Sequence, residues 1–467
     1  MAHVCASARH GPEMVAMSAD FAAGEMLALT ERIRAFRIYL LVAALLAGSS
    51  YAEPKREVPD YDGRGNPDSD RESWALWIPR AILWPFYAFH EYLIRRPIGA
   101  VMSHAEREHW GNSASSLFAF GPNNKHTLYP IARFDVGLLP SVGAHYNADD
   151  LFVDDNTVNL DVATWGKPRI VAAIADRYAL DPDDRVEARF AFRRAEDNVF
   201  VGIGPDVKAA TRSRYGTQNI EGSAAYRRRL FFSESGIEVR GGVHRMSFVD
   251  RTCCGDPSVL DRVAVGSLML PPGYGETYRA GFASLDLTLD SRDSKPGSGA
   301  FLHAFTRPSL ELGAHRAWGQ YGGEVGGSVD LTGHQRILTA QLAARFADAL
   351  WGGEVPLPEL ATVDDEIMPG FLPGWLTGGS IAVAQLDYTW PVWSGIDGET
   401  RVAVGNAFAD HLAGLRVGRL RWSWDFALST NPARDRGLEL RFGLGSETFD
   451  QGAEITSVRF AIGTKGL

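Results

Sequence analysis

From about residue 117 to its end, the chain alternates apolar and polar side chains with a period of two residues. Residues 420–428 carry leucine, tryptophan or phenylalanine at every even position, with Arg421 and Asp425 among the odd ones. Residues 438–444 show the same division. Because successive side chains of a β-strand point to opposite faces, each such segment has one apolar face and one polar or small face. The pattern predicts an all-β chain built from many strands.

Alternation by itself does not separate a soluble sandwich from a membrane barrel. The apolar faces carry large aromatic rings, and charges such as Glu439 and Arg441 share the opposite face, which favours a barrel with a polar lumen. Strands that cross lipid must pair all their backbone groups and therefore close into a ring. We predict that residues 113–467 form a transmembrane antiparallel β-barrel of about 16 strands. Turn signals separate the strands, among them Asp181-Pro182, Gly333 and Asn431-Pro432.

The composition agrees with this interpretation. The 49 glycines and 11% aromatic residues suit short strands joined by turns, with aromatic rings at a lipid boundary. The net charge of −10 argues against a nucleic-acid partner, because binding to phosphate backbones needs a basic surface. Outer-membrane lipid is the expected partner instead.

An export signal precedes the predicted barrel. Several arginines lead into the apolar run Ile38–Leu46, and Ser50-Tyr51-Ala52 fits a small-x-small cleavage site. The apolar run is too short to span a bilayer as a helix. Because the signal begins well inside the chain, we interpret Met26 or Met17 as the translation start. We expect residues 1–52 to be removed and the mature protein to reside in the bacterial outer membrane.

Two segments lie between the signal and the barrel. Residues 53–71 are charged and rich in proline, glycine and aspartate, which is typical of a linker. Residues 72–112 carry apolar side chains at helix-like spacing, broken by prolines into short pieces. We expect this second segment to lie in the membrane interface or the barrel mouth. The alternatives are a plug in the lumen and, for residues 72–110, a dock for a periplasmic partner.

The cysteines give little functional information. Cys253 and Cys254 are adjacent in a turn-rich stretch, and Cys5 lies upstream of the export signal. We favour two loop thiols without a catalytic role, and a strained vicinal disulfide in an oxidising compartment is the alternative. No histidine or cysteine spacing matches a zinc site.

Five short strings, in order along the chain, resemble one family of barrels. They are Asn198–Pro205 (containing F-x-G-x-G), Leu289–Gly299 (D-x-R-D…P-x-x-G), Gln385–Trp393, Gly405–Phe408 and Arg459–Thr464. Together they are similar to motifs of the BamA/TamA superfamily, the bacterial surface antigen barrels. The resemblance implies a 16-stranded barrel that inserts or translocates outer-membrane proteins and opens toward lipid at a weak seam between its first and last strands. The closing strand would form one side of this seam, through Val458, Phe460, Ile462 and Gly463.

Three departures from the family pattern bear on function. Residues 53–110 are too few for even one POTRA domain, the soluble domain that normally precedes such barrels and receives clients by strand addition. In the inward-folded loop, Pro369 replaces the family's arginine, and Ala403 falls where its barrel-wall aspartate belongs. The two charged partners are expected to be lost together, because one charge left alone and buried would lower the free energy of unfolding by several kcal/mol. Gly370 and Phe371 remain, so an aromatic contact is expected at the loop tip.

The remaining candidate residues have simpler interpretations. Asp290, Arg292 and Asp293, with Pro296 and Gly299, are better explained as a charged strand end that completes a turn than as an active constellation. His303 and His411 lack a local motif that pairs a nucleophile with an oriented base, so we expect no enzyme, cofactor or metal. Residues 227–229, a run of three arginines, fit a polar rim that meets lipid head groups, with specific anionic-lipid binding as the alternative.

Two functions are therefore carried forward. The first is assembly or transport of outer-membrane proteins or lipids by a barrel that lacks POTRA domains. The second is a passive channel or structural barrel that is gated or plugged by residues 72–110.

Overall fold

The computed structural model describes residues 118–465, apart from 252–253, 293–296, 332–334, 365, 394–395 and 431–436. The predicted signal, linker and helical segment therefore lie outside the described residues. The same is true of Cys253, Asp293, Pro296, Gly333 and Asn431-Pro432.

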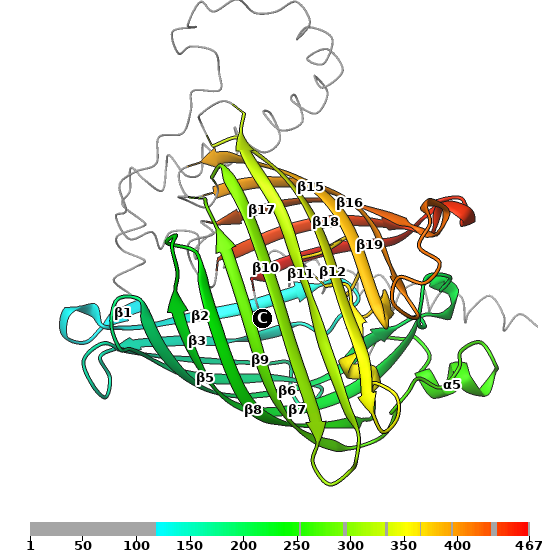
Figure 1. The fold of residues 1–467 in the computed structure, drawn as a ribbon, viewed down its shortest axis with the longest axis horizontal. Coiled ribbons are helices and arrows are strands. Elements are labelled where there is room, and N and C mark those ends of the chain that lie inside the picture. The colour runs from blue at the N-terminus through cyan, green and yellow to red at the C-terminus, as the bar shows by residue number, and fades with distance from the viewer. Residues whose placement is uncertain are drawn as a thin grey trace, which may run out of the picture.

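Sixteen antiparallel strands form a closed barrel (Figure 1). Strands that follow one another in the chain are paired, and β19 returns to pair with β2. The predicted all-β barrel of about 16 strands is therefore confirmed. The barrel strands are β2 (His126–Asp135), β3 (Ser141–Asp149), β4 (Asn156–Thr164), β5 (Arg169–Ala179), β6 (Asp184–Phe200), β7 (Ser213–Arg229), β8 (Gly236–Val249), β9 (Tyr278–Asp290), β10 (Gly299–Glu311), β11 (Ala317–Asp330), β12 (Ile337–Trp351), β15 (Ser380–Trp393), β16 (Ile396–Phe408), β17 (Arg421–Thr430), β18 (Leu438–Ser446) and β19 (Ile455–Thr464).

Short elements decorate this ring. β1 (Ala119–Phe120) pairs with the start of β2, and β13 (Ala361–Thr362) pairs with β14 (Thr377–Gly378) inside one connection. Among the described residues, no helix is both long and apolar enough to cross a membrane. The helices are η3 (Pro122–Asn124), η4 (Ala209–Thr211), α5 (Val259–Ala264), η5 (Leu357–Glu359), η6 (Val417–Arg419) and η7 (Phe449–Gln451).

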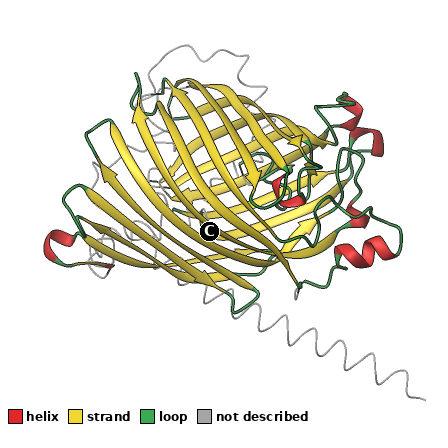
Figure 2. Cartoon of the chain, turned by 60° about the horizontal axis from the view of Figure 1, so that its bottom comes forward, coloured by secondary structure: helices red, strands yellow, loops and turns green. Residues whose placement is uncertain are grey.

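The connections distinguish the two ends of the barrel. Most helices gather at one end, where the long connections lie (Figure 2). We call this the loop end; its long connections are residues 201–212, 250–277, 352–379 and 409–420. The other is the turn end, with short connections such as residues 150–155, 180–183, 230–235 and 331–336. The start of β2 and the end of β19 also lie at the turn end.

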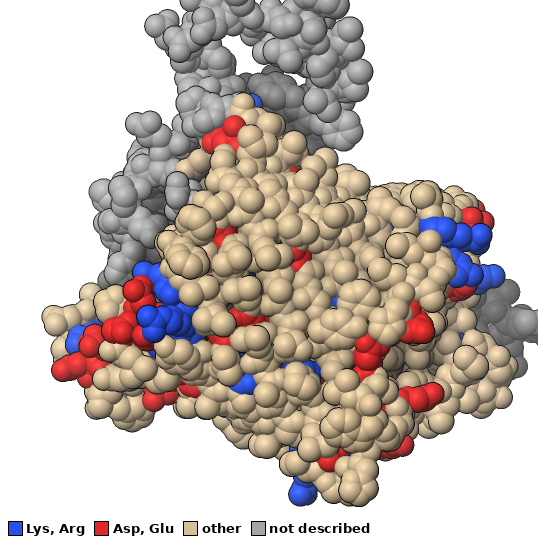
Figure 3. Space-filling model, viewed as in Figure 1, with Lys and Arg blue, Asp and Glu red and all other residues tan. Residues whose placement is uncertain are grey.

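Large apolar side chains cover the outside of the barrel. Leu302, Val325 and Leu342 are direct cross-strand neighbours on β10, β11 and β12, and they are 39%, 51% and 59% exposed. Leu386 and Val402 form a similar exposed pair on β15 and β16. Figure 3 shows a broad surface with few charges, with Lys, Arg, Asp and Glu gathered mainly toward the ends of the barrel. A continuous apolar belt of this kind fits contact with lipid.

The inside of the barrel is polar and closely paired. Arg441 on β18 binds Asp425 on β17 at 2.7 Å and Glu439 at 3.0 Å, and all three side chains are buried. Arg401 on β16 binds Asp387 on β15 at 2.5 Å. These charges occupy the strand faces opposite the apolar belt, as the alternation requires.

The two faces of one strand offer a direct stability test. Leu342 points outward, and the adjacent Gln341 on β12 points into the lumen beside Gln385. We expect Leu342→Arg to lower the free energy of unfolding in lipid vesicles by about 2–4 kcal/mol, because a charge would face hydrocarbon. Gln341→Arg should lower it by less than about 1 kcal/mol, since the lumen is polar. Equal losses in guanidinium unfolding of the two variants would contradict the assignment of the faces.

Candidate functional site: the internal loop and the barrel seam

Residues 352–379, between β12 and β15, fold into the lumen, and we call them the internal loop. Their apolar side chains form a cluster with residues on the inner wall of the barrel. Phe371, Trp375 and Leu376 of the loop are at most 2% exposed. Their cluster also includes Trp318 of β11 and Ala403 of β16. The internal loop is therefore a packed core inside the barrel at its loop end.

Glycines shape the contact between the tip of this loop and the wall. A Cβ at Gly370 would lie 2.1 Å from the carbonyl oxygen of Leu444, and one at Gly445 would lie 2.6 Å from the Phe371 ring. A Cβ at Gly443 would lie 2.9 Å from the Cα of Gly370. The backbone of the tip and the Phe371 ring can therefore lie flat against β18 only because these positions lack side chains.

Arg459 of β19 holds the loop tip to the wall. Its guanidinium is 1% exposed and donates from Nη1 to the carbonyl oxygens of Pro369 and Phe371, both at 3.4 Å. The neighbouring Ser457 donates its hydroxyl to the carbonyl oxygen of Gly370 at 2.7 Å. The tip is thus bound through its backbone, and no charged side chain of its own is needed.

The same guanidinium binds a carboxylate on the first barrel strand. Arg459 Nε lies 3.2 Å from Oδ1 and 3.0 Å from Oδ2 of Asp135 on β2, and Nη2 also donates to Oδ2. Asp135 is 3% exposed. A planar guanidinium with five N–H donors can serve both a carboxylate and backbone carbonyls. One buried arginine therefore joins β19, β2 and the internal loop.

Pro369 and Ala403, where the resembled motifs have an arginine and an aspartate, supply no charge to the loop tip. Pro369 contributes only a carbonyl oxygen, and Ala403 is buried in the apolar cluster of the loop. The arginine comes instead from the wall, on β19, and its carboxylate partner comes from β2. No local spacing could reveal this contact, because Asp135 and Arg459 are separated by 324 positions in the chain.

The seam between β19 and β2 is short. Three residue pairs join the strands: Ala461–Asp135, Ile462–Phe134 and Gly463–Arg133. In contrast, β18 pairs with β19 along all of Leu438–Ser446. Among neighbouring barrel strands in the described part of the chain, β19 and β2 have the fewest paired residues.

The residues expected at the seam occupy different positions relative to it. Ile462 and Gly463 are paired there, and Phe460 accepts a bond from the Val136 N–H at 2.9 Å. Val458 lies beyond the paired stretch and is 61% exposed on the outside. Gly463 has φ of +145°, and a Cβ there would lie 2.1 Å from the carbonyl oxygen of Ala132.

The charged strand end at Asp290 forms contacts that are local to the β9–β10 connection. Arg292 donates to Asp290 from its backbone N–H at 3.0 Å and from Nε and Nη2 at 2.8 and 2.6 Å. The Arg292 guanidinium also lies over the Phe301 ring, 4.3 Å from its centroid. Gly299 has φ of +148°, close to Ser291. These contacts lie at the turn end, whereas the internal loop packs toward the loop end.

The F-x-G-x-G string, which starts at Phe200, touches the internal loop. Ile203 forms a parallel bridge with Thr377, and the Gly204 N–H donates to the Thr377 carbonyl oxygen at 2.9 Å. Asn406, from another of the matched strings, donates to the Pro205 carbonyl oxygen at 3.1 Å. Two strings that are far apart in sequence therefore meet beside the internal loop.

Cys254 differs from the favoured expectation of free loop thiols. It forms a disulfide bond. The residue has φ of +78°, in a turn between β8 and α5.

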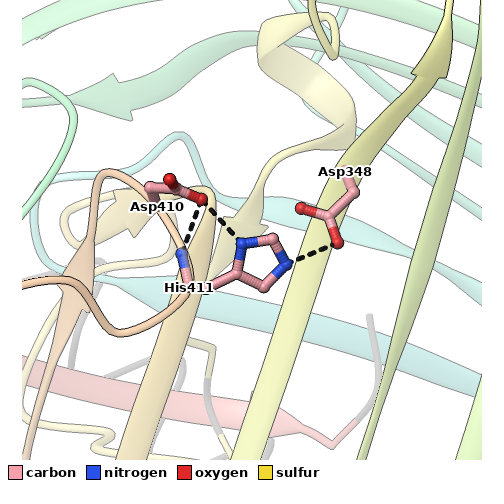
Figure 4. A group of neighbouring side chains, drawn as sticks. All are labelled: Asp348, Asp410 and His411. Atoms are coloured by element: carbon pink, nitrogen blue, oxygen red, sulfur yellow. Dashed lines mark hydrogen bonds and ion pairs between the residues drawn. The ribbon is translucent and has the colours of Figure 1, made fainter.

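One group of side chains at the loop end has the composition of a metal site. Asp348 of β12, with Asp410 and His411 of the 409–420 connection, places ligand atoms within 4.8 Å of one another (Figure 4). His411 Nδ1 lies 2.7 Å from Asp410 Oδ1, and Nε2 lies 2.9 Å from Asp348 Oδ2. A metal needs a neutral imidazole with a free lone pair, whereas a carboxylate at each ring nitrogen favours the protonated ring. This geometry favours an ion-paired histidine held between two carboxylates. His303 is separate from this group and lies 3.7 Å from Asp286.

No protein-family model matches the sequence. No curated protein matches it either. Among solved structures, BamA from Haemophilus ducreyi lacking POTRA domains 1-3 is similar, with a TM-score of 0.50 and 13% identity over 73% of this chain and 70% of that chain. CdiB from Acinetobacter baumannii has a TM-score of 0.45 and 11% identity over 73% of this chain and 59% of that chain. The likeness to BamA shows the fold, a closed antiparallel barrel of 16 strands.

The contribution of Arg459 can be measured by a mutant cycle. We expect Arg459→Met to lower the free energy of unfolding by about 3 kcal/mol, because Asp135 stays buried and retains mainly the contact to Arg133 at 3.6 Å. Asp135→Asn should cost a similar amount, and the double variant should cost less than the sum by about 1 kcal/mol or more. The control is Arg416→Gln, which removes an exposed pair with Asp450 and should cost less than about 1 kcal/mol. Strict additivity in guanidinium unfolding would contradict a direct bond.

The ion-paired histidine makes a prediction about pH. Hydrogen bonds to Asp410 and Asp348 raise the pKa of His411 above its ordinary value of 6.5. The contact therefore stabilises the 409–420 connection fully below pH 6.5 and is lost as pH rises through the higher pKa of the folded state. An NMR titration of the ring in detergent micelles should give a pKa above 6.5, and Asp348→Asn should lower it. A measured pKa at or below 6.5 would show that the carboxylates do not hold the ring protonated.

Proposed function

We propose that this chain is a bacterial outer-membrane barrel that inserts or translocates outer-membrane proteins or lipids by opening between β19 and β2. The outward apolar belt and the polar lumen support a place in the membrane. In outer-membrane barrels the short turns face the periplasm. By that rule the turn end would face the periplasm and the loop end the cell exterior.

The observation that carries this proposal is the short seam, together with the residue that bridges it. Opening the barrel elsewhere would break longer runs of backbone pairing, such as that between β18 and β19. Opening it between β19 and β2 would break three residue pairs, the bond from Val136 to Phe460 and the contact of Arg459 with Asp135. Because Arg459 also binds the carbonyls of Pro369 and Phe371, the position of the internal loop would be linked to the state of the seam.

A passive channel fits the interior less well. The internal loop packs against both β11 and β16 through Trp318 and Ala403, and its tip reaches β18 and β19. A core that touches opposite parts of the wall favours a barrel that is closed at rest. In this proposal residues 72–110 supply the contact with a client or a periplasmic partner.

A disulfide across the seam tests the proposal. Phe134 and Ile462 are cross-strand neighbours with outward side chains, so Phe134→Cys with Ile462→Cys should join β2 to β19 on oxidation. In cells depleted of the native protein, we expect the oxidised variant to lose most of its ability to restore outer-membrane protein or lipid levels. Reduction should return that ability.

The matched control joins two strands that are not expected to separate. Phe426 and Phe442 are outward neighbours on β17 and β18, and the corresponding cysteine pair should leave function unchanged when oxidised. Full function of the oxidised seam variant would rule out lateral opening. A steady conductance of the purified protein in planar bilayers, the same with and without the seam disulfide, would instead favour the passive channel.

A further inference from the structure

A polar cavity of about 610 Å³ lies inside the barrel near its turn end. Strands β2 to β6 and β8 line it, with Tyr129, His145 and Asn159 among the neutral or weakly basic groups. The alternate residues of the same strands, such as Ile174 and Phe190, form part of the outward apolar belt. The cavity is thus separate from the internal loop, whose cluster fills the loop end.

The carboxylates of this cavity are already paired. Glu187 accepts from Arg177 Nε at 2.7 Å and from Arg240 Nη2 at 2.9 Å. Arg240 Nη2 also donates to Glu238 at 2.9 Å. The third carboxylate of the lining, in β4, is 2.6 Å from a ring nitrogen of His145.

Two arginines of the lining are left over. Arg185 and Arg189 of β6 are exposed in this lining, and neither forms a salt bridge in the described part of the chain, although Glu187 and Glu238 attract Arg185 at longer range. Arg227 of β7 lies directly opposite Arg185 on the same face. Like charges at directly opposed positions repel each other. The lining holds four arginines against three carboxylates, and this excess of positive charge favours binding of an anion.

We propose that this cavity binds a phosphate-bearing anion through Arg185 and Arg189. Their Cα atoms are about 13 Å apart along the strand, so the two long side chains can converge on one ligand of diphosphate size. Guanidinium groups match the geometry of phosphate oxygens with paired N–H donors. The ligand is either a soluble phosphate or the head group of an anionic lipid, since both carry the same chemistry.

Calorimetric titration of pyrophosphate into the full mature chain, residues 53–467, in uncharged detergent tests this assignment. We expect binding that weakens as salt increases. Arg185→Gln with Arg189→Gln should weaken the affinity by about tenfold or more, because charge-assisted hydrogen bonds are lost. Glu238→Gln should tighten it, because it removes a negative charge from the lining while leaving both arginines in place.

Arg228→Gln is the matched control. Arg228 lies at the same end of the barrel, is 59% exposed, and faces Asp184 at 3.5 Å outside the cavity, so its loss should leave the affinity unchanged. Electrophoretic mobility without boiling checks that each variant forms the barrel. If the double arginine variant fails that check, the Glu238→Gln and Arg189→Gln variants decide the question by their opposite effects on affinity.

The two sources of phosphate are separated by competition. If micelles that contain phosphatidylglycerol displace pyrophosphate, the ligand is a lipid head group, and if they do not, it is a soluble phosphate. Either result supports the site. Absence of pyrophosphate binding, equal affinity in the arginine variants, or binding of an acidic peptide in place of pyrophosphate would overturn the assignment.

Discussion

The requirement that every backbone N–H and C=O in lipid finds a partner governs this structure. A sheet in that environment has no free edge, so its first and last strands must meet. Here they meet along three residue pairs only, with Gly463 allowing the backbones to approach closely. A buried arginine and aspartate complete the junction from inside. The least extensive pairing of the ring is therefore also the place where side chains contribute most directly to closure.

Arg459 also shows how a barrel wall can hold a loop that has no charged side chain at its tip. A charge pair needs both partners, because a single buried charge is costly. In this chain the loop tip offers only carbonyl oxygens, from Pro369 and Phe371, and the wall supplies both the arginine and the carboxylate. The tip can therefore lie flat against Gly443 and Gly445 without a side chain of its own entering the wall.

The two-residue alternation of apolar and polar side chains predicts the fold class, because it follows from strand geometry alone. Each strand segment shows this alternation independently of the others. Residues 420–428 suffice to distinguish an apolar face from a face with Arg421 and Asp425. The site was harder to predict. Gly370 and Phe371 were found through a short motif, but Arg459 contacts Asp135 across nearly the whole chain, and Arg185 differs from the paired Arg177 only in what lies opposite. Such contacts depend on which residues of neighbouring strands are paired, and composition and motif spacing do not reveal this pairing.

The bridge between the first and last strands has a consequence for how the chain matures. The internal loop begins at residue 352, well before β19 begins at Ile455 in the sequence. Until that last strand has arrived, neither Asp135 nor the carbonyl oxygens of the loop tip have their guanidinium partner. Ordering of the tip and completion of the ring therefore belong to one concerted late event, and a nascent chain truncated before Arg459 would have a loosely held interior as well as an incomplete wall.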